Sequence, residues 1–383
     1  MRMKKIILAV VILFSLLFSI NVKAVTKENP DEALNLIEGA KAGILIEQSS
    51  KEILYQKEMD RRLSPASMTK IMTLLLIYEA MENNQFNLDT MLTTSETAAS
   101  MGGSQVYLKV GEKISVDEAL KCVCVVSAND CAVLLAEEVS GSEEYFVRKM
   151  NEKAKSLGCN NTNFSDCTGL TSQNHYTSAY DLAIISAELL TKYPEVIKYT
   201  TIKEDYIRKD TSSPFWLVNT NKMIGRVEGL NGLKTGHTSF SGYCITLSMS
   251  KDDMNLISVV FGYDSATKRN SESLELLKYG FSNYKLNKVV AKGDILQIVN
   301  HILYKDDIEV IALEDIYHLV KKNEELKYDI KYDFKINKDS CEGTINVYLN
   351  DEIVGSGKVG SSSPIKRKNI FEIFASVVHR ALG

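Results

Sequence analysis

The sequence lacks a strong excess of either charge. Its 383 residues carry a formal net charge of −4, and 25% of them are charged. A protein whose main partner is a nucleic acid usually carries a clear basic excess. The composition therefore argues against a nucleic-acid partner. No low-complexity tract or internal repeat is present, and a chain of this length is long for one core, so two domains are expected.

Metal-ligand spacings and a disulfide framework are also missing. The five histidines form no HExxH motif or similar pattern, so no metal site or cofactor is expected. The seven cysteines are odd in number and scattered, without a CxxC repeat, which argues against a disulfide scaffold. Cys122, Cys124 and Cys131 lie in apolar runs, where a free cysteine behaves as a small buried hydrophobic residue.

The N-terminus has the pattern of an export signal. Basic residues among the first five precede an apolar stretch from Ile6 to about Ile20, and small residues follow up to Ala24. This stretch is short for a membrane-spanning helix, although a retained anchor is the alternative. We expect residues 1–24 to be a signal peptide, removed after Ala24, and the mature protein to work outside the cytoplasmic membrane.

The pattern of residues 25–285 predicts one domain of mixed helices and strands. Residues 41–56 are typical of a hairpin, and the apolar run after Lys70 is typical of a buried helix. Further helical stretches follow, and residues 232–250 and 254–264 then indicate two strands joined by a polar turn. Strands from both ends of the domain can meet in one antiparallel sheet flanked by helices, which is an α+β fold.

The C-terminal part has a different pattern. Residues 286–362 indicate a small all-β domain, in which residues 326–336 alternate between apolar and charged side chains and predict a half-buried strand. A strand pair is expected around Asn350 and Asp351. Residues 363–383 form a basic segment followed by an amphipathic helix, too short to span a bilayer but suited to lie in its interface. Docking of this helix on its own domain is the alternative.

Three short motifs point to chemistry. In chain order they are Ser67-Met68-Thr69-Lys70, Ser127-Ala128-Asn129 and Lys234-Thr235-Gly236. The Ser-x-x-Lys spacing alone is weak evidence, because it recurs elsewhere in the chain. The ordered set is much more specific, since each motif also lies in a suitable local context.

The first motif fits an activated nucleophile. A serine hydroxyl needs an adjacent base, and Lys70 lies one helical turn after Ser67. Lys70 can act as that base only when its amine is partly neutral. Burial beside an apolar helix and a second cation, Lys234, would both lower its pKa. Pro65 fits a helix start, where backbone N–H groups point at developing negative charge.

The third motif fits a substrate-binding edge strand. Gly236 allows close approach of a substrate backbone, which could pair with the strand. Lys234 and Thr235 offer a cation and a hydroxyl to a carboxylate. The backbone N–H groups of His237 and Ser67 are suited to form an oxyanion hole.

The second motif completes the predicted site. Ser127 is placed to relay a proton to the leaving amine, and Asn129 to hold the substrate amide. Each side chain also has an ordinary explanation, namely a helix cap for the serine and asparagine and a solvated strand residue for the lysine. The ordered set favours catalysis.

These stretches resemble a known family. SPASMTKIMT, GGSQVYLKVGE, SANDCAVLLAE and GLNGLKTGHTSFSGYC look like the serine-type D-alanyl-D-alanine carboxypeptidases, the low-molecular-weight penicillin-binding proteins. The similarity covers residues 40–285, and the β domain with its C-terminal helix resembles theirs with weaker motifs. The implied fold is a serine β-lactamase/transpeptidase-like catalytic domain, followed by the all-β domain and the amphipathic helix.

The resemblance implies a function in cell-wall biogenesis. Family members remove the terminal D-alanine from peptidoglycan pentapeptides through an acyl-serine intermediate, and β-lactam antibiotics are their covalent inhibitors. It further implies peripheral attachment to the outer face of the cytoplasmic membrane through the C-terminal helix. Ser67 is then the nucleophile, Lys70 the base, and Arg269 helps to hold the terminal carboxylate. The site is completed by Ser127, Asn129, Lys234, Thr235, Gly236 and His237.

Two other functions share some of these features. A β-lactamase shares the motifs but must hydrolyse its acyl-enzyme quickly, in the best-known class with a glutamate. No Glu-x-x-x-Asn occurs between Ser127 and Lys234, and the β domain suits a wall enzyme better. A penicillin-acylated sensor or wall-binding module without turnover is the non-enzymatic alternative, and the intact pair of Ser67 and Lys70 argues against it.

Two large side chains near the motifs have open roles. Phe240, shortly after the Lys-Thr-Gly motif, is large enough to narrow the pocket. Trp216, the only tryptophan, either borders the site or packs in the core.

Overall fold

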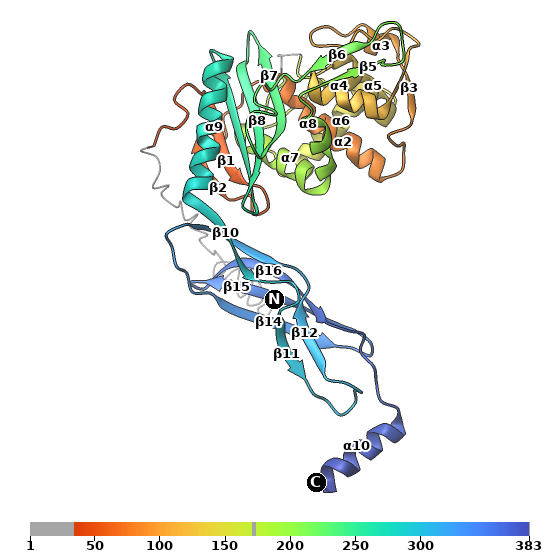
Figure 1. The fold of residues 1–383 in the computed structure, drawn as a ribbon, viewed down its shortest axis with the longest axis vertical. Helices are drawn as coiled ribbons and strands as arrows, with labels where there is room; N and C mark the ends of the chain where they lie inside the picture. The colour runs from red at the N-terminus through yellow and green to blue at the C-terminus, as the bar shows by residue number, and fades with distance from the viewer. Residues whose placement is uncertain (1–33, 171–173, 383) are drawn as a thin grey trace, which may run out of the picture. The chain divides into compact units, whose positions relative to one another are not determined.

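A computed structural model describes residues 34–170 and 174–382 (Figure 1). The predicted signal peptide, residues 1–24, lies outside the described residues. Among the described residues, no helix combines the length and the apolar character that crossing a membrane requires. All seven cysteines are described, and each is buried and free.

The larger domain contains a mixture of strands and helices, as expected. Its strands are β1 (Ala42–Glu47), β2 (Ile53–Lys57), β3 (Met91–Thr93), β4 (Lys113–Ser115), β5 (Glu204–Ile207), β6 (Phe215–Val218), β7 (Leu230–Thr238), β8 (Gly242–Lys251) and β9 (Met254–Tyr263). Its helices are the 3-10 turns η1 (Ala66–Thr69) and η2 (Pro194–Val196) and the helices α2 (Lys70–Glu82), α3 (Glu96–Ala99), α4 (Val116–Val125), α5 (Asn129–Ser140), α6 (Glu143–Ser156), α7 (Ala179–Lys192), α8 (Ile197–Thr200) and α9 (Ala266–Asn283).

A five-stranded antiparallel sheet organises this domain. Its order is β2-β1-β9-β8-β7, so strands from the two ends of the domain pair through β1 and β9, as the sequence predicts. Helix α9 covers one face and α7 the other (Figure 1). Leu45 of β1 belongs to the cluster on the α9 side, whereas Ile44 and Ile46 belong to the helical cluster, because successive strand residues point to opposite faces.

The strand with the Lys-Thr-Gly motif lies at the edge of the sheet, as predicted. Its length was predicted wrongly, since residues 232–250 form two strands instead of one. The chain turns at 239–241, where the Thr238 N–H donates to Ser241 Oγ and the Ser241 N–H donates to Thr238 Oγ1, each at 3.0 Å. This short turn pairs β7 with β8, and the other edge of β7 has no strand partner among the described residues.

The C-terminal part is an all-β domain followed by one helix, as expected. Its elements are β10 (Tyr284–Val290), β11 (Ile295–Val299), β12 (Ile308–Ala312), β13 (Ile316–Lys321), β14 (Asp329–Ile336), β15 (Cys341–Leu349), β16 (Glu352–Ser361) and α10 (Ile370–Leu382). The main sheet has the order β11-β12-β16-β15-β14, and β10 pairs with β13. Val310, Ile345 and Val347 are fully buried in its core.

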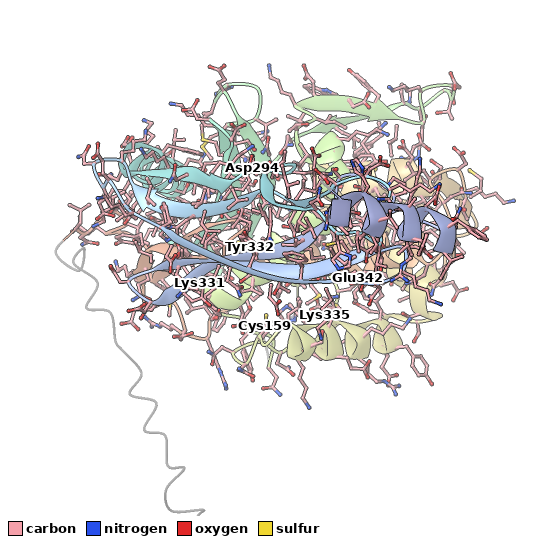
Figure 2. All side chains as sticks on the ribbon, turned by 90° about the horizontal axis from the view of Figure 1, so that it is seen from below. Cys159, Asp294, Lys331, Tyr332, Lys335 and Glu342 are labelled. Carbon is pink, nitrogen blue, oxygen red and sulfur yellow. The ribbon has the colours of Figure 1, made fainter. Side chains whose placement is uncertain are left out.

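Strand β14 is less buried than its alternating pattern suggests. Ile330 and Tyr332 are 40% and 37% exposed, because β14 is the last strand of its sheet. Lys335 lies opposite Glu342 of β15, and both are labelled in Figure 2. The alternation of apolar and charged residues predicted the strand correctly, but the strand is more exposed than this pattern suggests.

Candidate active site

The three motifs converge beside β7. Ser67 lies on η1, and Lys70 is the first residue of α2. The Ser-x-Asn motif spans the junction of α4 and α5, with Asn129 as the first residue of α5. The turn η1 packs on β7, where a Cβ added at Gly236 would lie 2.6 Å from the Pro65 carbonyl oxygen. Gly236 is therefore needed for close approach of η1, a reason that adds to the substrate approach, which stays a prediction.

Lys70 is the centre of the arrangement. Its side chain is fully buried, and its Nζ lies 3.2 Å from Ser67 Oγ, 2.6 Å from Asn129 Oδ1 and 2.9 Å from the Thr168 carbonyl oxygen. These three acceptors fix the amine next to the serine hydroxyl.

Burial lowers the pKa of Lys70 to about 8, because desolvation disfavours the ammonium. The charges of Cys167, Asp166 and Asp130 oppose this shift. Burial also places the pKa of Lys234 well below its usual range, and repulsion by Lys70 adds to that effect. A lysine with a pKa near 8 is partly neutral at ordinary pH, as a general base must be.

A turn that the sequence analysis missed presents the Thr168 carbonyl to Lys70. Asp166 Oδ1 accepts hydrogen bonds from the backbone N–H groups of Thr168 and Gly169, at 2.8 and 2.5 Å. A Cβ at Gly169 would collide with the Ala66 carbonyl oxygen, at 1.8 Å, so this turn packs directly behind the nucleophile. The Asp-x-Thr-Gly pattern within a loop of turn-forming residues is the signal that could have revealed it.

The Ser-x-Asn motif is buried and connected to Lys70. Asn129 Nδ2 donates to the Gly102 carbonyl oxygen at 2.7 Å, while its Oδ1 accepts from Lys70. Ser127 is 3% exposed, and its Oγ has no hydrogen-bond partner among the described residues. A buried hydroxyl without a partner is costly, so Ser127 Oγ is left available for a reacting group.

Two residues of the site have unusual backbone conformations. Ala66, directly before Ser67, has φ of 48°, and Ser127 has φ of 64°. Left-handed backbone is unfavourable for both residue types and persists only when surrounding contacts enforce it. The positions of Ser67 and Ser127 are therefore set by tertiary packing.

A second group of side chains is suited to bind a carboxylate. Lys234 and Arg269 are 2% and 5% exposed, and neither forms an ion pair within the described part of the chain. Each positive charge disfavours the other, since Arg269 contributes to the lowered pKa of Lys234. Thr235 Oγ1 donates to Thr220 Oγ1 at 2.8 Å, which fixes its hydroxyl. Buried cations without counterions favour an anionic ligand.

The remaining candidates lie nearby. His237 is the second-to-last residue of β7 and stacks on Tyr243, with ring centroids 4.0 Å apart. Asp130, which the sequence analysis did not single out, accepts the backbone N–H groups of Val106 and Leu108 and so ties residues 106–108 to α5. Asp130 is fully buried and directly follows Asn129. Its contacts therefore hold residues 106–108 next to the Ser-x-Asn motif.

Trp216 does not pack in the core. It is 54% exposed on β6 and stacks on Tyr206 of β5, with ring centroids 6.5 Å apart. Strand β6 leads within two residues to Thr220, which contacts Thr235. The exposed position rules out the core role that was one of the two open interpretations.

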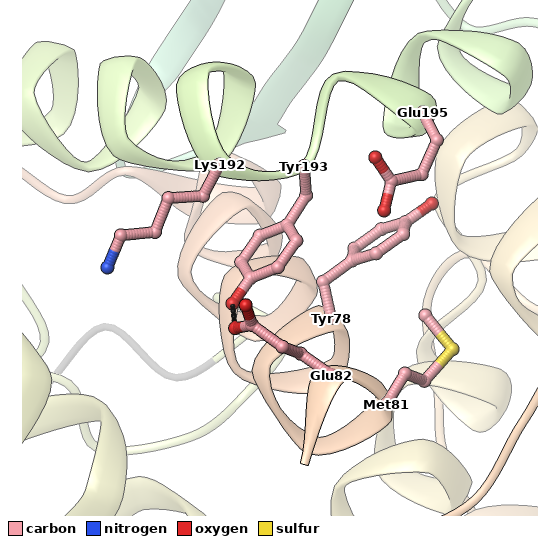
Figure 3. Close-up of a pocket in the computed structure, with 6 residues that line it drawn as sticks. All are labelled: Tyr78, Met81, Glu82, Lys192, Tyr193 and Glu195. Atoms are coloured by element: carbon pink, nitrogen blue, oxygen red, sulfur yellow. Dashed lines mark hydrogen bonds between the residues drawn. The ribbon is translucent and has the colours of Figure 1, made fainter. Parts of the chain in front are cut away.

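A hollow of about 380 Å³ lies elsewhere in the domain, between the ends of α2 and α7 (Figure 3). The stacked rings of Tyr78 and Tyr193 line it, and Tyr193 donates a hydrogen bond to Glu82. Tyr78 lies eight residues after Lys70 on α2, which corresponds to about 12 Å of helix. This hollow is therefore separate from the site around Ser67.

Comparisons with known proteins agree with this geometry. A family model described as D-alanyl-D-alanine carboxypeptidase matches residues 26–265, and one described as penicillin-binding protein 5, C-terminal domain, matches residues 284–367. The chain is 39% identical over 388 residues to D-alanyl-D-alanine carboxypeptidase DacF of Bacillus subtilis, covering 99% of this chain and 98% of that protein.

Solved structures give the same result. Penicillin-binding protein 5 from Haemophilus influenzae is 28% identical, with a TM-score of 0.71, covering 86% of this chain and 98% of that one. Penicillin-binding protein D2 from Listeria monocytogenes in its ampicillin-bound form is 29% identical, with a TM-score of 0.57, covering 63% and 98%. Motifs, fold and relatives together place this chain in the D-alanyl-D-alanine carboxypeptidase family of penicillin-binding proteins.

Proposed function

We propose that this protein is a serine-type D-Ala-D-Ala carboxypeptidase that removes the terminal D-alanine from peptidoglycan pentapeptides. The observation that carries the proposal is the contact of Ser67 Oγ with the buried Nζ of Lys70, 3.2 Å apart, together with the lowered pKa of that lysine. The carboxypeptidase relatives support the choice of substrate.

Acylation begins with proton transfer from Ser67 to neutral Lys70. Ser67 Oγ attacks the carbonyl carbon of the penultimate D-alanine, and the carbonyl π electrons move to oxygen. The backbone N–H groups of Ser67 and His237 stabilise that oxyanion. Its collapse breaks the peptide bond, and Ser127 gives its proton to the nitrogen of the departing D-alanine while it takes up the proton held by Lys70, so that Lys70 is neutral again.

Lys234, Thr235 and Arg269 hold the terminal carboxylate of the substrate. The two buried cations lack an anionic partner within the described residues, which supports this role. Asn129 holds the substrate amide, although its side chain contacts Lys70 and Gly102 in the free protein. Gly236 keeps β7 close to η1, so that the substrate lies next to Ser67.

Hydrolysis completes the cycle. A water molecule loses its proton to neutral Lys70 and attacks the acyl carbon, and Ser67 leaves with a proton returned to its oxygen. β-Lactams enter at the same serine and acylate it, in line with the ampicillin-bound relative.

The same proposal includes the location of the enzyme. Export through residues 1–24 delivers the protein to the outer face of the cytoplasmic membrane, and α10 attaches it there. Ile370, Phe371 and Phe374 are 75%, 82% and 71% exposed, which supports an interfacial role. Binding to phospholipid vesicles that is unchanged after deletion of residues 363–383 would contradict this attachment.

The activity is tested with a peptide that ends in D-Ala-D-Ala. The mature protein should release D-alanine and bind penicillin covalently, and Ser67→Ala should lose both. Release of D-alanine by Ser67→Ala would refute the nucleophile assignment. Penicillin labelling without D-alanine release would favour a sensor, whereas rapid penicillin turnover would favour a β-lactamase.

A further inference from the structure

A hollow of about 370 Å³ opens beside the catalytic serine. Lys41, Arg61 and Arg62 line it, together with Phe240 and neutral polar groups, and none of its lining residues is an aspartate or glutamate. Three cations around one hollow create a locally positive potential, which attracts an anion.

The three cations have no acidic partner in the part of the chain that the structure describes. Within residues 34–170 and 174–382, Lys41, Arg61 and Arg62 form no ion pair. Arg62 is nevertheless held in place, since its Nε donates to Asn161 Oδ1 at 3.1 Å and its guanidinium lies 5.0 Å from the Tyr176 ring centroid. A guanidinium fixed in this way loses less freedom when it binds a carboxylate.

The hollow adjoins the active site on two sides. Ser64 lines it and precedes Ser67 by three residues, so their Cα atoms are at most about 11 Å apart. Phe240 lines it as well and follows the end of β7 by two residues. The hollow is therefore within reach of a bound substrate.

The direction of the substrate follows from the proposed function, on which this step rests. With the terminal carboxylate at Lys234 and Thr235, the upstream part of the peptide runs along β7 past His237 toward Phe240. An extended residue spans about 3.3 Å, so a side chain one or two residues upstream of D-Ala-D-Ala reaches the hollow.

We propose that this hollow is a subsite for a carboxylate carried by the substrate one or two residues upstream of D-Ala-D-Ala. Arg61, Arg62 and Lys41 bind the carboxylate, and a guanidinium can do so with two parallel hydrogen bonds. Phe240, which is 68% exposed, packs against the apolar part of the acyl chain. The subsite thus selects acidic over neutral stem peptides.

The test uses two pairs of synthetic peptides. One pair carries glutamate or glutamine directly before D-Ala-D-Ala, and the other carries them one residue earlier. The wild type should show a kcat/KM about two- to fivefold higher for the glutamate peptide in at least one pair, the range that exposed ion pairs give. Added salt should reduce this preference, because these cations are exposed.

Matched variants locate the effect. The double variant Arg61→Gln, Arg62→Gln removes both guanidinium groups and should bring the preference close to one, whereas Arg226→Gln, which neutralises a cation outside the hollow, should keep it. Covalent penicillin labelling of each variant verifies that its active site is folded. If a variant does not fold, the wild-type preference and its loss in salt still decide the question.

Two results would overturn the subsite. Equal kcat/KM for both members of both pairs would do so, as would a preference that persists in the double variant or disappears equally in Arg226→Gln. Either result leaves D-alanine release intact and so leaves the proposed function standing. Absence of D-alanine release from every peptide would instead contradict the proposed function itself.

Discussion

Among the described non-glycine residues, the C-terminal β domain has left-handed backbone only at an asparagine and an aspartate, whereas the catalytic domain also has it at residue types that disfavour it. In the β domain, Asn350 and Asp351 have φ of 49° and 65° and form the turn between β15 and β16. Asparagine and aspartate tolerate this conformation, so local preference and fold agree. In the catalytic domain, Ala66 and Ser127 have positive φ against their preference, and both lie at the active site.

The two domains also treat charge differently. In the β domain, Lys288 and Lys331 are exposed and lie 2.9 and 3.2 Å from the carboxylates of Asp315 and Asp329. In the catalytic domain, Lys70 is fully buried and has no salt bridge among the described residues. Burying a charge without a partner destabilises the fold. The active site of the catalytic domain therefore combines unfavourable backbone conformations with a desolvated amine. The turn and the ion pairs of the β domain show neither feature.

Replacement of Lys70, the buried base that distinguishes the catalytic domain from the β domain, should have the largest effect on activity. We expect Lys70→Ala to lower kcat/KM for D-alanine release by about a thousandfold, because general-base catalysis contributes a factor in that range. Covalent labelling is not expected in this variant, so thermal unfolding serves to verify that it is folded, although Asn129 Oδ1 and the Thr168 carbonyl lose their donor. Activity within tenfold of the wild type would contradict the assignment of Lys70.

Neutralisation of Asp166 should give an intermediate effect. Its charge raises the pKa of Lys70, so Asp166→Asn should shift the pH dependence of kcat/KM to lower pH while the amide oxygen preserves the turn. Asp166→Ala leaves the N–H groups of Thr168 and Gly169 without their acceptor and should cost about 2 kcal/mol of stability. A pH profile of Asp166→Asn identical to that of the wild type would show that Asp166 does not act on Lys70.

Deletion of the C-terminal helix should have the smallest effect on chemistry. A protein without residues 363–383 should keep the wild-type kcat/KM on a soluble peptide, because the described active-site contacts lie in the catalytic domain. The same protein should no longer sediment with anionic phospholipid vesicles. The full-length protein with Phe371→Ser and Phe374→Ser is the matched control, and it should bind vesicles weakly for the same reason.

Motif order and hydrophobic pattern predicted much of the site. The hairpin at β1 and β2, the buried helix α2 and the edge position of β7 all follow from local sequence. These features depend on periodicity and turn residues, which a single chain displays directly.

The missed features depend on contacts between distant segments. The Thr168 carbonyl lies 98 residues from Lys70, and Asn129 lies 27 residues from its partner Gly102. No local pattern specifies such pairs. The close approach of the Pro65 carbonyl to Gly236 was missed for a similar reason, since the two residues are far apart in the sequence.

The central claim is that a partly neutral Lys70 activates Ser67, and the pH dependence of kcat/KM for D-alanine release tests it most directly. The pKa of Lys70 is about 8. At a pH below this value Lys70 is mostly protonated, and its amine then has no lone pair to accept the serine proton. We therefore predict that kcat/KM rises about tenfold per pH unit at low pH and levels off above pH 8, because titration of one base controls the rate. A kcat/KM that stays constant from pH 6 to pH 9 would contradict the account.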